Sequence, residues 1–194
     1  EMRVPFELSR RTLDAVERGA ADPDLQPLKD AARKIAFAED RAVFDGYAAV
    51  GIRGIRAEAE GPALKLPADV NHYPATIAQA LSRLRLAGVN GPYVLVLGEK
   101  AFAAVSGASD EGYPVLKHLQ PLLDGDIVWA PGIEGGLLLS TRGGDFSLHL
   151  GQDVSIGYRS HTERAVRLYL QESFTFRLLS PEAAVALQPP SLRK

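Results

Sequence analysis

The 194-residue chain contains no cysteine and only one methionine and one tryptophan. The absence of cysteine excludes a disulfide scaffold and any thiolate chemistry. No apolar run approaches the roughly 20 residues that a helix needs to span a bilayer. The net charge is −2 at pH 7, so the chain also lacks the basic excess with which a dedicated nucleic-acid binder neutralises phosphates.

What the chain does contain is typical of a globular protein, with 46% hydrophobic and 24% charged residues. A chain of this length can bury a core without a metal or disulfide. Apolar residues at helical spacing predict helices over residues 8–18, 24–47, 74–84, 101–105 and 115–123. Apolar runs and alternating patterns predict strands, separated by glycine-rich turns, over residues 93–97, 127–130, 137–140, 146–150, 154–158, 166–170 and 174–178. This mixture predicts an α+β fold.

Motifs that carry catalytic chemistry are missing. The adjacent acids Glu39 and Asp40 point about 100° apart on a helix, so they cannot form a dyad. The four histidines, at positions 72, 118, 149 and 161, have no metal-ligand spacing. Ser106 lacks a nucleophile elbow, and residues 98–100 lack the rest of a phosphate loop. The pair Gly143-Gly144 has no following helix and is interpreted as a hairpin turn.

Several sequence blocks carry a resemblance to a known family. They cover most of the chain, from about Arg3 to Leu187, and occur in a fixed order. They are Val16-Glu17-Arg18-Gly19, Ala38-Glu39-Asp40, Phe44-Asp45-Gly46, Gly88-Val89-Asn90-Gly91-Pro92-Tyr93, residues 140–146, residues 150–158 and residues 168–176. On these blocks the chain resembles the encapsulin shell proteins, also described as the linocin-type bacteriocin family, and especially their actinobacterial members.

The resemblance implies a tailed-phage major-capsid-like fold with peripheral and axial domains. Residues 1–60 are expected to form part of the peripheral domain, including the end of an extended loop and a long helix. Residues 61–143 are expected to form the axial domain, 144–187 the returning peripheral strands, and 188–194 a flexible tail. The family has a further N-terminal helix and loop arm. The chain is therefore expected to be part of a subunit, completed by another chain.

Two sites follow from the resemblance. Leu123, Asp124, Gly125 and Asp126 are expected to rim a five-fold pore, where rings of aspartates would favour cations. The alternative is a capped turn between a helix and a strand. Ile156, Tyr158 and His161 are expected to form part of a groove that docks the targeting peptide of a cargo protein.

No cofactor or metal is expected. Some members of the family bind a flavin through a tryptophan, but the matching position here is Arg11. The chain's one tryptophan, Trp129, is expected on a strand, packed in the core or at an interface.

The resemblance implies a structural role and no enzymatic activity. Copies of the chain are expected to assemble into an icosahedral shell in the cytoplasm, an encapsulin nanocompartment, around cargo enzymes such as a dye-decolorising peroxidase. No membrane or nucleic-acid partner is expected. The alternatives are a phage or prophage major capsid protein that packages DNA, and a flavin-binding or hydrolytic enzyme.

Overall fold

The computed structural model describes residues 1–110 and 112–190. Residues 191–194, on which the predicted flexible tail partly falls, lie outside the described residues. The chain forms two compact units. Unit 1 comprises Glu1–Glu39 and Leu148–Thr175, and unit 2 comprises Asp40–Ser147 and Phe176–Lys194. The peripheral and axial boundaries expected at residues 60 and 143 stay a prediction.

Unit 1 contains a three-stranded sheet in the order β1-β11-β10, with β1 and β11 antiparallel. Its elements are β1 (Met2–Ser9), α1 (Arg10–Glu17), α2 (Gln26–Phe44), β10 (Phe146–His161) and β11 (Ala165–Leu178), of which α2, β10 and β11 continue into unit 2. Both helices of unit 1 begin at side chains that accept a backbone N–H, Ser9 from Thr12 and Asp24 from Gln26.

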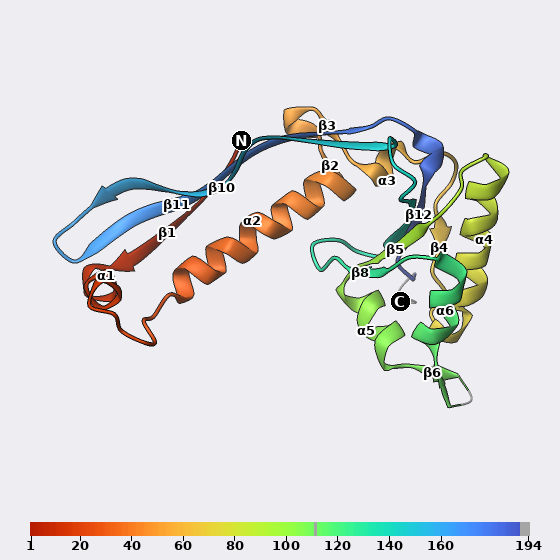
Figure 1. The fold of residues 1–194 in the computed structure, drawn as a ribbon, viewed down its shortest axis with the longest axis horizontal. Coiled ribbons are helices and arrows are strands. Elements are labelled where there is room, and N and C mark those ends of the chain that lie inside the picture. Colours follow the sequence, from red (N-terminus) through yellow and green to blue (C-terminus); the bar gives the residue numbers. More distant parts are fainter. Residues whose placement is uncertain (111, 191–194) are drawn as a thin grey trace. The chain divides into compact units, whose positions relative to one another are not determined.

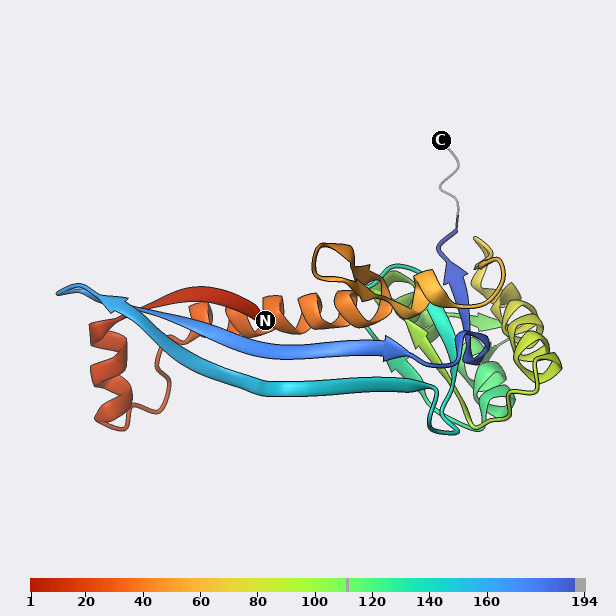
Figure 2. The ribbon, with the colours of Figure 1, turned by 90° about the horizontal axis from the view of Figure 1, so that it is seen from above.

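Helix α2 packs against β1 and β11. The alternating residues Phe6, Leu8 and Leu170 lie on one face of the sheet and contact Ala31 and Ile35 of α2, and all five are buried. Figures 1 and 2 show α2 running along these strands. The small core of unit 1 therefore lies between one helix and two strands.

Unit 2 contains a five-stranded mixed sheet in the order β4-β12-β9-β5-β8. The sheet strands are β4 (Leu64–Lys65), β5 (Tyr93–Leu97), β8 (Ile127–Trp129), β9 (Gly136–Ser140) and β12 (Ala184–Gln188). The helices are α3 (Ile55–Glu58), α4 (Tyr73–Leu86), α5 (Glu99–Gly107) and α6 (Val115–Leu123), with 3-10 turns η1 (Ala48–Val50), η2 (Val70–His72) and η3 (Pro181–Ala183). Two short hairpins pair β2 (Gly46–Tyr47) with β3 (Ile52–Arg53), and β6 (Ser109–Asp110) with β7 (Tyr113–Pro114).

The main core of unit 2 lies between this sheet and α4, α5 and α6. Ile77 of α4, Leu119 of α6 and Leu95 of β5 are completely buried there. The other face of the sheet is also buried, since Val96 and Leu137 are 3% and 0% exposed. Strands buried on both faces read as continuous apolar runs, which explains the sequence of β5.

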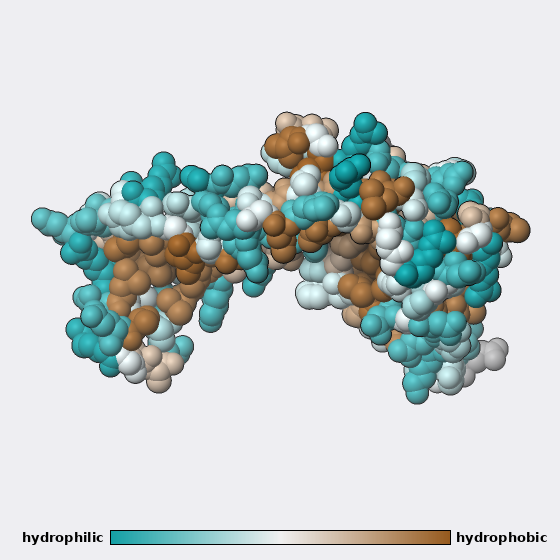
Figure 3. All heavy atoms as spheres, turned by 45° about the horizontal axis from the view of Figure 1, so that its top comes forward, coloured by the Kyte–Doolittle hydropathy of each residue, from teal (hydrophilic) through white to brown (hydrophobic). Residues whose placement is uncertain are grey.

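The structure confirms the α+β class and most of the predicted elements, but several of their bounds were wrong. The helix predicted over residues 24–47 ends at Phe44, and Tyr47 lies in β2. Residues 146–150 and 154–158 form one strand, β10, which runs through Gly151. A Cβ at position 151 would come within 2.9 Å of Ser173 Oγ, so the glycine there fits a close approach to β11 and not a turn. Leu8, predicted to be helical, belongs to β1 and pairs with Val166. Apolar side chains also lie on the surface of both units (Figure 3).

Candidate functional site

The turn that joins α6 to β8 contains the residues predicted to line a pore. Leu123 ends α6 and is completely buried. Asp124 has a left-handed backbone with φ 52° and caps the helix. A Cβ on Gly125 would lie 2.4 Å from the carbonyl oxygen of Tyr93, so a larger residue does not fit. Of the four residues, only Asp124 and Asp126 present charged side chains to solvent.

The backbone of this turn has a clear structural role. The carbonyl oxygen of Asp126 accepts a hydrogen bond from Leu95 N at 3.0 Å, next to the parallel pairing of β5 and β8. This is the capped turn that the sequence offered as the alternative to a pore rim. A pore rim requires neighbouring copies of the chain, so that role stays a prediction.

Strand β10 carries the residues predicted to dock cargo. It is an edge strand, and the described apolar cluster of unit 1 includes none of its residues. Ile156 and Tyr158 are each 58% exposed. Together with three more half-exposed apolar residues they occupy even-numbered positions of the strand, interrupted by Gln152. We call these five residues the β10 row: Leu148, Leu150, Val154, Ile156 and Tyr158.

On the opposite face of β10, the backbone at Gly157 is covered. A Cβ on Gly157 would come within 2.2 Å of the Tyr169 ring, so that ring packs directly on the strand backbone. The apolar surface that β10 offers to another molecule is therefore the β10 row.

The structure brings two of the predicted docking residues into contact. The Tyr158 hydroxyl hydrogen-bonds His161 Nδ1, and their ring centroids are 6.0 Å apart. Ile156 lies two residues before Tyr158, on the same face of β10 by strand alternation. The arrangement places an exposed apolar side chain beside a hydrogen-bonded polar pair, and peptide docking there stays a prediction.

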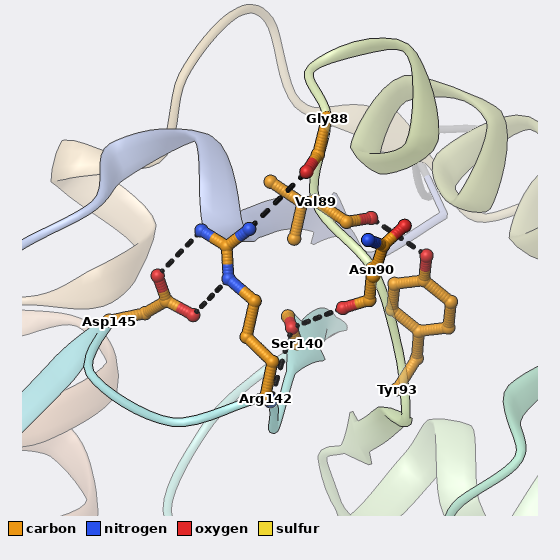
Figure 4. A network of polar contacts seen from close by, with 7 residues as sticks. All are labelled: Gly88, Val89, Asn90, Tyr93, Ser140, Arg142 and Asp145. Carbon is orange, nitrogen blue, oxygen red and sulfur yellow. Dashed lines mark hydrogen bonds and ion pairs between the residues drawn. The ribbon is translucent and has the colours of Figure 1, made fainter.

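A polar network fixes the loop between β9 and β10 (Figure 4). The Arg142 guanidinium donates two hydrogen bonds to the buried Asp145 carboxylate, at 3.0 and 2.9 Å, and a third to the carbonyl oxygen of Gly88. Ser140 Oγ donates to the carbonyl oxygen of Asn90 at 2.7 Å. These bonds connect the loop to the segment between α4 and β5.

The electrostatics of this network follow from the ion pair. Hydrogen bonding to Arg142 is the largest cause that lowers the pKa of Asp145, assisted by Ser180, while burial opposes it.

The prediction of a hairpin at Gly143-Gly144 was wrong. Both glycines have positive φ, but β9 and β10 belong to different sheets. The bidentate pair closes the turn in place of a strand-to-strand ladder.

Glu172 of β11 is a buried acid that the sequence analysis missed. Its side chain is on the sheet face that α2 covers, opposite Met2, and it is 2% exposed. Its Oε2 atom is buried without a hydrogen-bond partner in the structure. Burial chiefly raises the pKa of this carboxyl group, and Glu39 and Asp153 raise it further. The alternation of β11 could have revealed this burial, because it puts position 172 on the same face as Leu168 and Leu170.

Four further expectations concern Trp129, Arg11, metal binding and membrane spans. Trp129 is 56% exposed on the edge strand β8, so core packing was wrong and interface packing stays a prediction. Arg11 lies exposed on α1. The described residues contain no group of three or more His, Cys, Asp or Glu side chains able to hold a metal ion. None of the helices in the described part of the chain is long and apolar enough to cross a membrane.

The sequence of the chain is similar to those of known proteins. Residues 1–175 match the family described as "Encapsulating protein for peroxidase". The chain is 59% identical over 187 residues to a type 1 encapsulin shell protein of Rhodococcus erythropolis, covering 96% of this chain and 71% of that protein. It is 56% identical over 186 residues to a type 1 encapsulin shell protein of Mycobacterium tuberculosis, covering 96% and 70%.

Solved structures resemble the fold. A virus-like particle protein from Pyrococcus furiosus superposes with a TM-score of 0.70 at 20% identity, covering 96% of this chain and 75% of that chain. A protein of Gordonia phage Cozz superposes with a TM-score of 0.63 at 16% identity, covering 98% and 70%. These similarities confirm the capsid-like fold.

Proposed function

This chain belongs to the encapsulin shell-protein family, and we propose on that basis that it is a structural subunit whose copies assemble into a closed icosahedral compartment. The observation that carries the proposal is identity above 50% to named shell proteins over nearly the whole chain. The two units fit this use, since both present exposed apolar surfaces of the kind that a second polypeptide covers.

The content of the particles tests this function. We expect purified particles to contain protein cargo, identified by mass spectrometry, and to show the ultraviolet absorbance ratio of protein without DNA. Particles filled with DNA would instead support the phage-capsid alternative. That alternative shares the fold, but its support is a structural likeness at low sequence identity.

We further propose that the shell encloses a peroxidase whose targeting peptide docks on the β10 row. The family description names a peroxidase as the encapsulated protein. The row offers Ile156 as an apolar contact and the Tyr158–His161 pair as a polar one, both on an edge strand. An apolar segment bound there would remove half-exposed side chains from water, which stabilises the complex by about 25 cal/mol per Å² buried.

The docking proposal is tested by co-expressing cargo with shell variants. We expect Ile156→Ser to reduce the cargo recovered with intact shells, because a serine replaces the apolar contact. Val16→Ser, at a half-exposed position of α1, is the matched control and should retain cargo. Equal cargo loading in both variants would contradict the proposal.

The acidic pore rim is a separate proposal. Copies of Asp124 and Asp126 around an axis would attract cations, within a screening length of about 8–10 Å in physiological salt. Asparagine tolerates the left-handed backbone of position 124, so replacing both aspartates by asparagine should preserve the turn. We expect slower cation entry into assembled shells. The same charge change at Asp14 and Asp22, both exposed in unit 1, should leave entry unchanged. Unchanged uptake in the pore variant would refute the acidic rim.

The remaining proposals concern the setting of the shell. We propose that it resides in the cytoplasm and has no enzymatic activity of its own, in line with relatives named as shell proteins. We also keep the hypothesis that a further polypeptide segment completes the subunit. Size-exclusion chromatography with light scattering tests this hypothesis, because a well-behaved isolated monomer would contradict it.

A further inference from the structure

The hairpin of β2 and β3 ends in an exposed apolar tip, residues 47–51, which we call the β2–β3 tip. Tyr47 is 51% and Val50 is 60% exposed, and Ala48, Ala49 and Gly51 between and after them are exposed as well. No charged residue occurs between Asp45 and Arg53. In Figure 3 a projection of brown, beige and white spheres lies at the place where Figure 1 shows the turn between β2 and β3. Surface turns are commonly polar, so an apolar tip suggests a binding role.

The base of this hairpin is closely packed. A Cβ on Gly54 would lie 2.1 Å from Gly46 N, so the two glycines bring the strands into direct backbone contact. The turn itself is closed by a 3.1 Å hydrogen bond from Gly51 N to the carbonyl oxygen of Ala48. Ile52 then points into the protein and is 8% exposed. The backbone at and beneath the tip is therefore closely packed and hydrogen-bonded.

Arg56 anchors the same hairpin to the five-stranded sheet. Its guanidinium donates to Asp45 Oδ1 at 2.8 Å, and to the carbonyl oxygens of Glu134 at 2.7 Å and Leu187 at 3.1 Å. These bonds connect the segments on both sides of the tip to the rest of unit 2, at Glu134 and at Leu187 of β12. A rigid, preorganised apolar projection loses little conformational entropy on binding, which favours a stable protein contact.

We propose that the β2–β3 tip is an assembly contact that inserts against a second copy of this chain. The inference rests on the proposed shell function. A closed shell built from one chain needs contacts in which one surface of a subunit meets a different surface of its neighbour. Tyrosine is enriched at the centre of protein interfaces, and Tyr47 is accompanied by small apolar residues that allow close approach.

The composition of the tip disfavours a lipid surface as its partner. Membrane-binding segments combine large apolar residues such as Trp, Phe and Leu with free basic residues. The tip has one tyrosine, two alanines and a valine. The nearest basic side chain in sequence, Arg53, is paired with Glu58 at 2.8 Å. A protein surface of the same chain is the partner that this composition fits.

The cysteine-free sequence allows a direct test on the full chain. Val50→Cys introduces a single thiol at the tip, and Ser82→Cys introduces one at an exposed polar position of α4. Maleimide labelling is measured for each variant in cargo-free shells and in dissociated subunits. We expect position 50 to react about tenfold more slowly, or slower still, in shells, because labelling then requires the contact to open. Position 82 should react equally in both states.

A cross-linking step identifies the partner. A photo-reactive maleimide attached to the thiol of the Val50→Cys variant is expected to join two copies of this chain, and mass spectrometry of the product should place the cross-link on a second copy. Shells in which position 50 reacts as fast as in dissociated subunits, or cross-links only within its own chain or to another protein, would overturn the inference. If the unmodified chain forms no shells, either alone or together with the segment that completes the subunit, the proposed function itself fails, which distinguishes the two outcomes.

A second variant separates the contact from folding. Tyr47→Ser combined with Val50→Ser should leave the melting temperature of dissociated subunits unchanged, because both side chains are more than half exposed. The same double variant should lose most of the assembled fraction in size-exclusion chromatography. Normal assembly of this variant would also overturn the inference.

Discussion

Unit 1 and unit 2 bury their sheets to different extents. In unit 2, Leu95 and Leu138 face the helices and Leu137 faces the opposite side, and all three are 0% exposed. In unit 1, α2 covers β1 and β11, while Ile156 and Tyr158 of β10 are 58% exposed. The larger core of unit 2 therefore supplies much of the stability, whereas unit 1 leaves an apolar row available to another polypeptide.

The largest expected effect tests this contrast in burial. Leu138→Ala in β9 should lower the free energy of unfolding by about 2–5 kcal/mol, because it leaves a cavity in a closely packed core. Leu150→Ala on the β10 row, at a side chain that is 54% exposed, should change it by less than about 0.5 kcal/mol. Urea denaturation of dissociated subunits measures both. Similar losses in the two variants would break the comparison.

A smaller effect concerns the buried acid of unit 2. Asp145→Asn should destabilise the subunit at neutral pH, because Arg142 holds the pKa of Asp145 below its unfolded value. The stabilisation is present above the unfolded pKa of about 3.9 and is lost as pH falls through the folded-state pKa. Melting temperatures of the two proteins should therefore converge below about pH 4. Asp22→Asn, at an exposed position, is the control. A difference that does not depend on pH would contradict this account.

The buried acid of unit 1 should behave in the opposite way, with the smallest effect of the three. Burial raises the pKa of Glu172, so the folded state binds a proton more tightly than the unfolded state. Stability is then highest below the unfolded pKa of about 4.3 and falls as pH rises through the folded-state pKa. Glu172→Gln should raise the melting temperature near neutral pH and leave it unchanged in acid. A lower melting temperature at neutral pH would show that Glu172 has a partner when ionised.

Local patterns predicted the elements whose contacts lie within a short stretch of sequence. Residues 93–97 and 115–123 were predicted with the bounds that the structure has for β5 and α6, since an unbroken apolar run and a helical stripe are local signals. Gly151 was mistaken for a turn because the side chain that approaches it, that of Ser173, lies on another strand and is distant in the sequence. Glycine alone does not reveal which of these two roles it has.

The candidate sites were harder to predict from the sequence than the helices and strands. The family resemblance singled out Ile156, Tyr158 and His161, and the structure adds the contact between the last two. The exposure of Trp129 and of the β2–β3 tip could not be predicted, because an apolar residue in a sequence is expected to be buried until its neighbours are known. A surface that a second polypeptide covers contains the same apolar residue types as a core, so the sequence alone does not distinguish the two.

The central claim is that copies of this chain build a closed shell, and negative-stain electron microscopy of the purified chain tests it most directly. The account predicts closed particles of uniform diameter, which disappear when the β2–β3 tip carries Tyr47→Ser and Val50→Ser. A field without particles, both for the unmodified chain alone and for the chain together with the segment that completes the subunit, would contradict the claim.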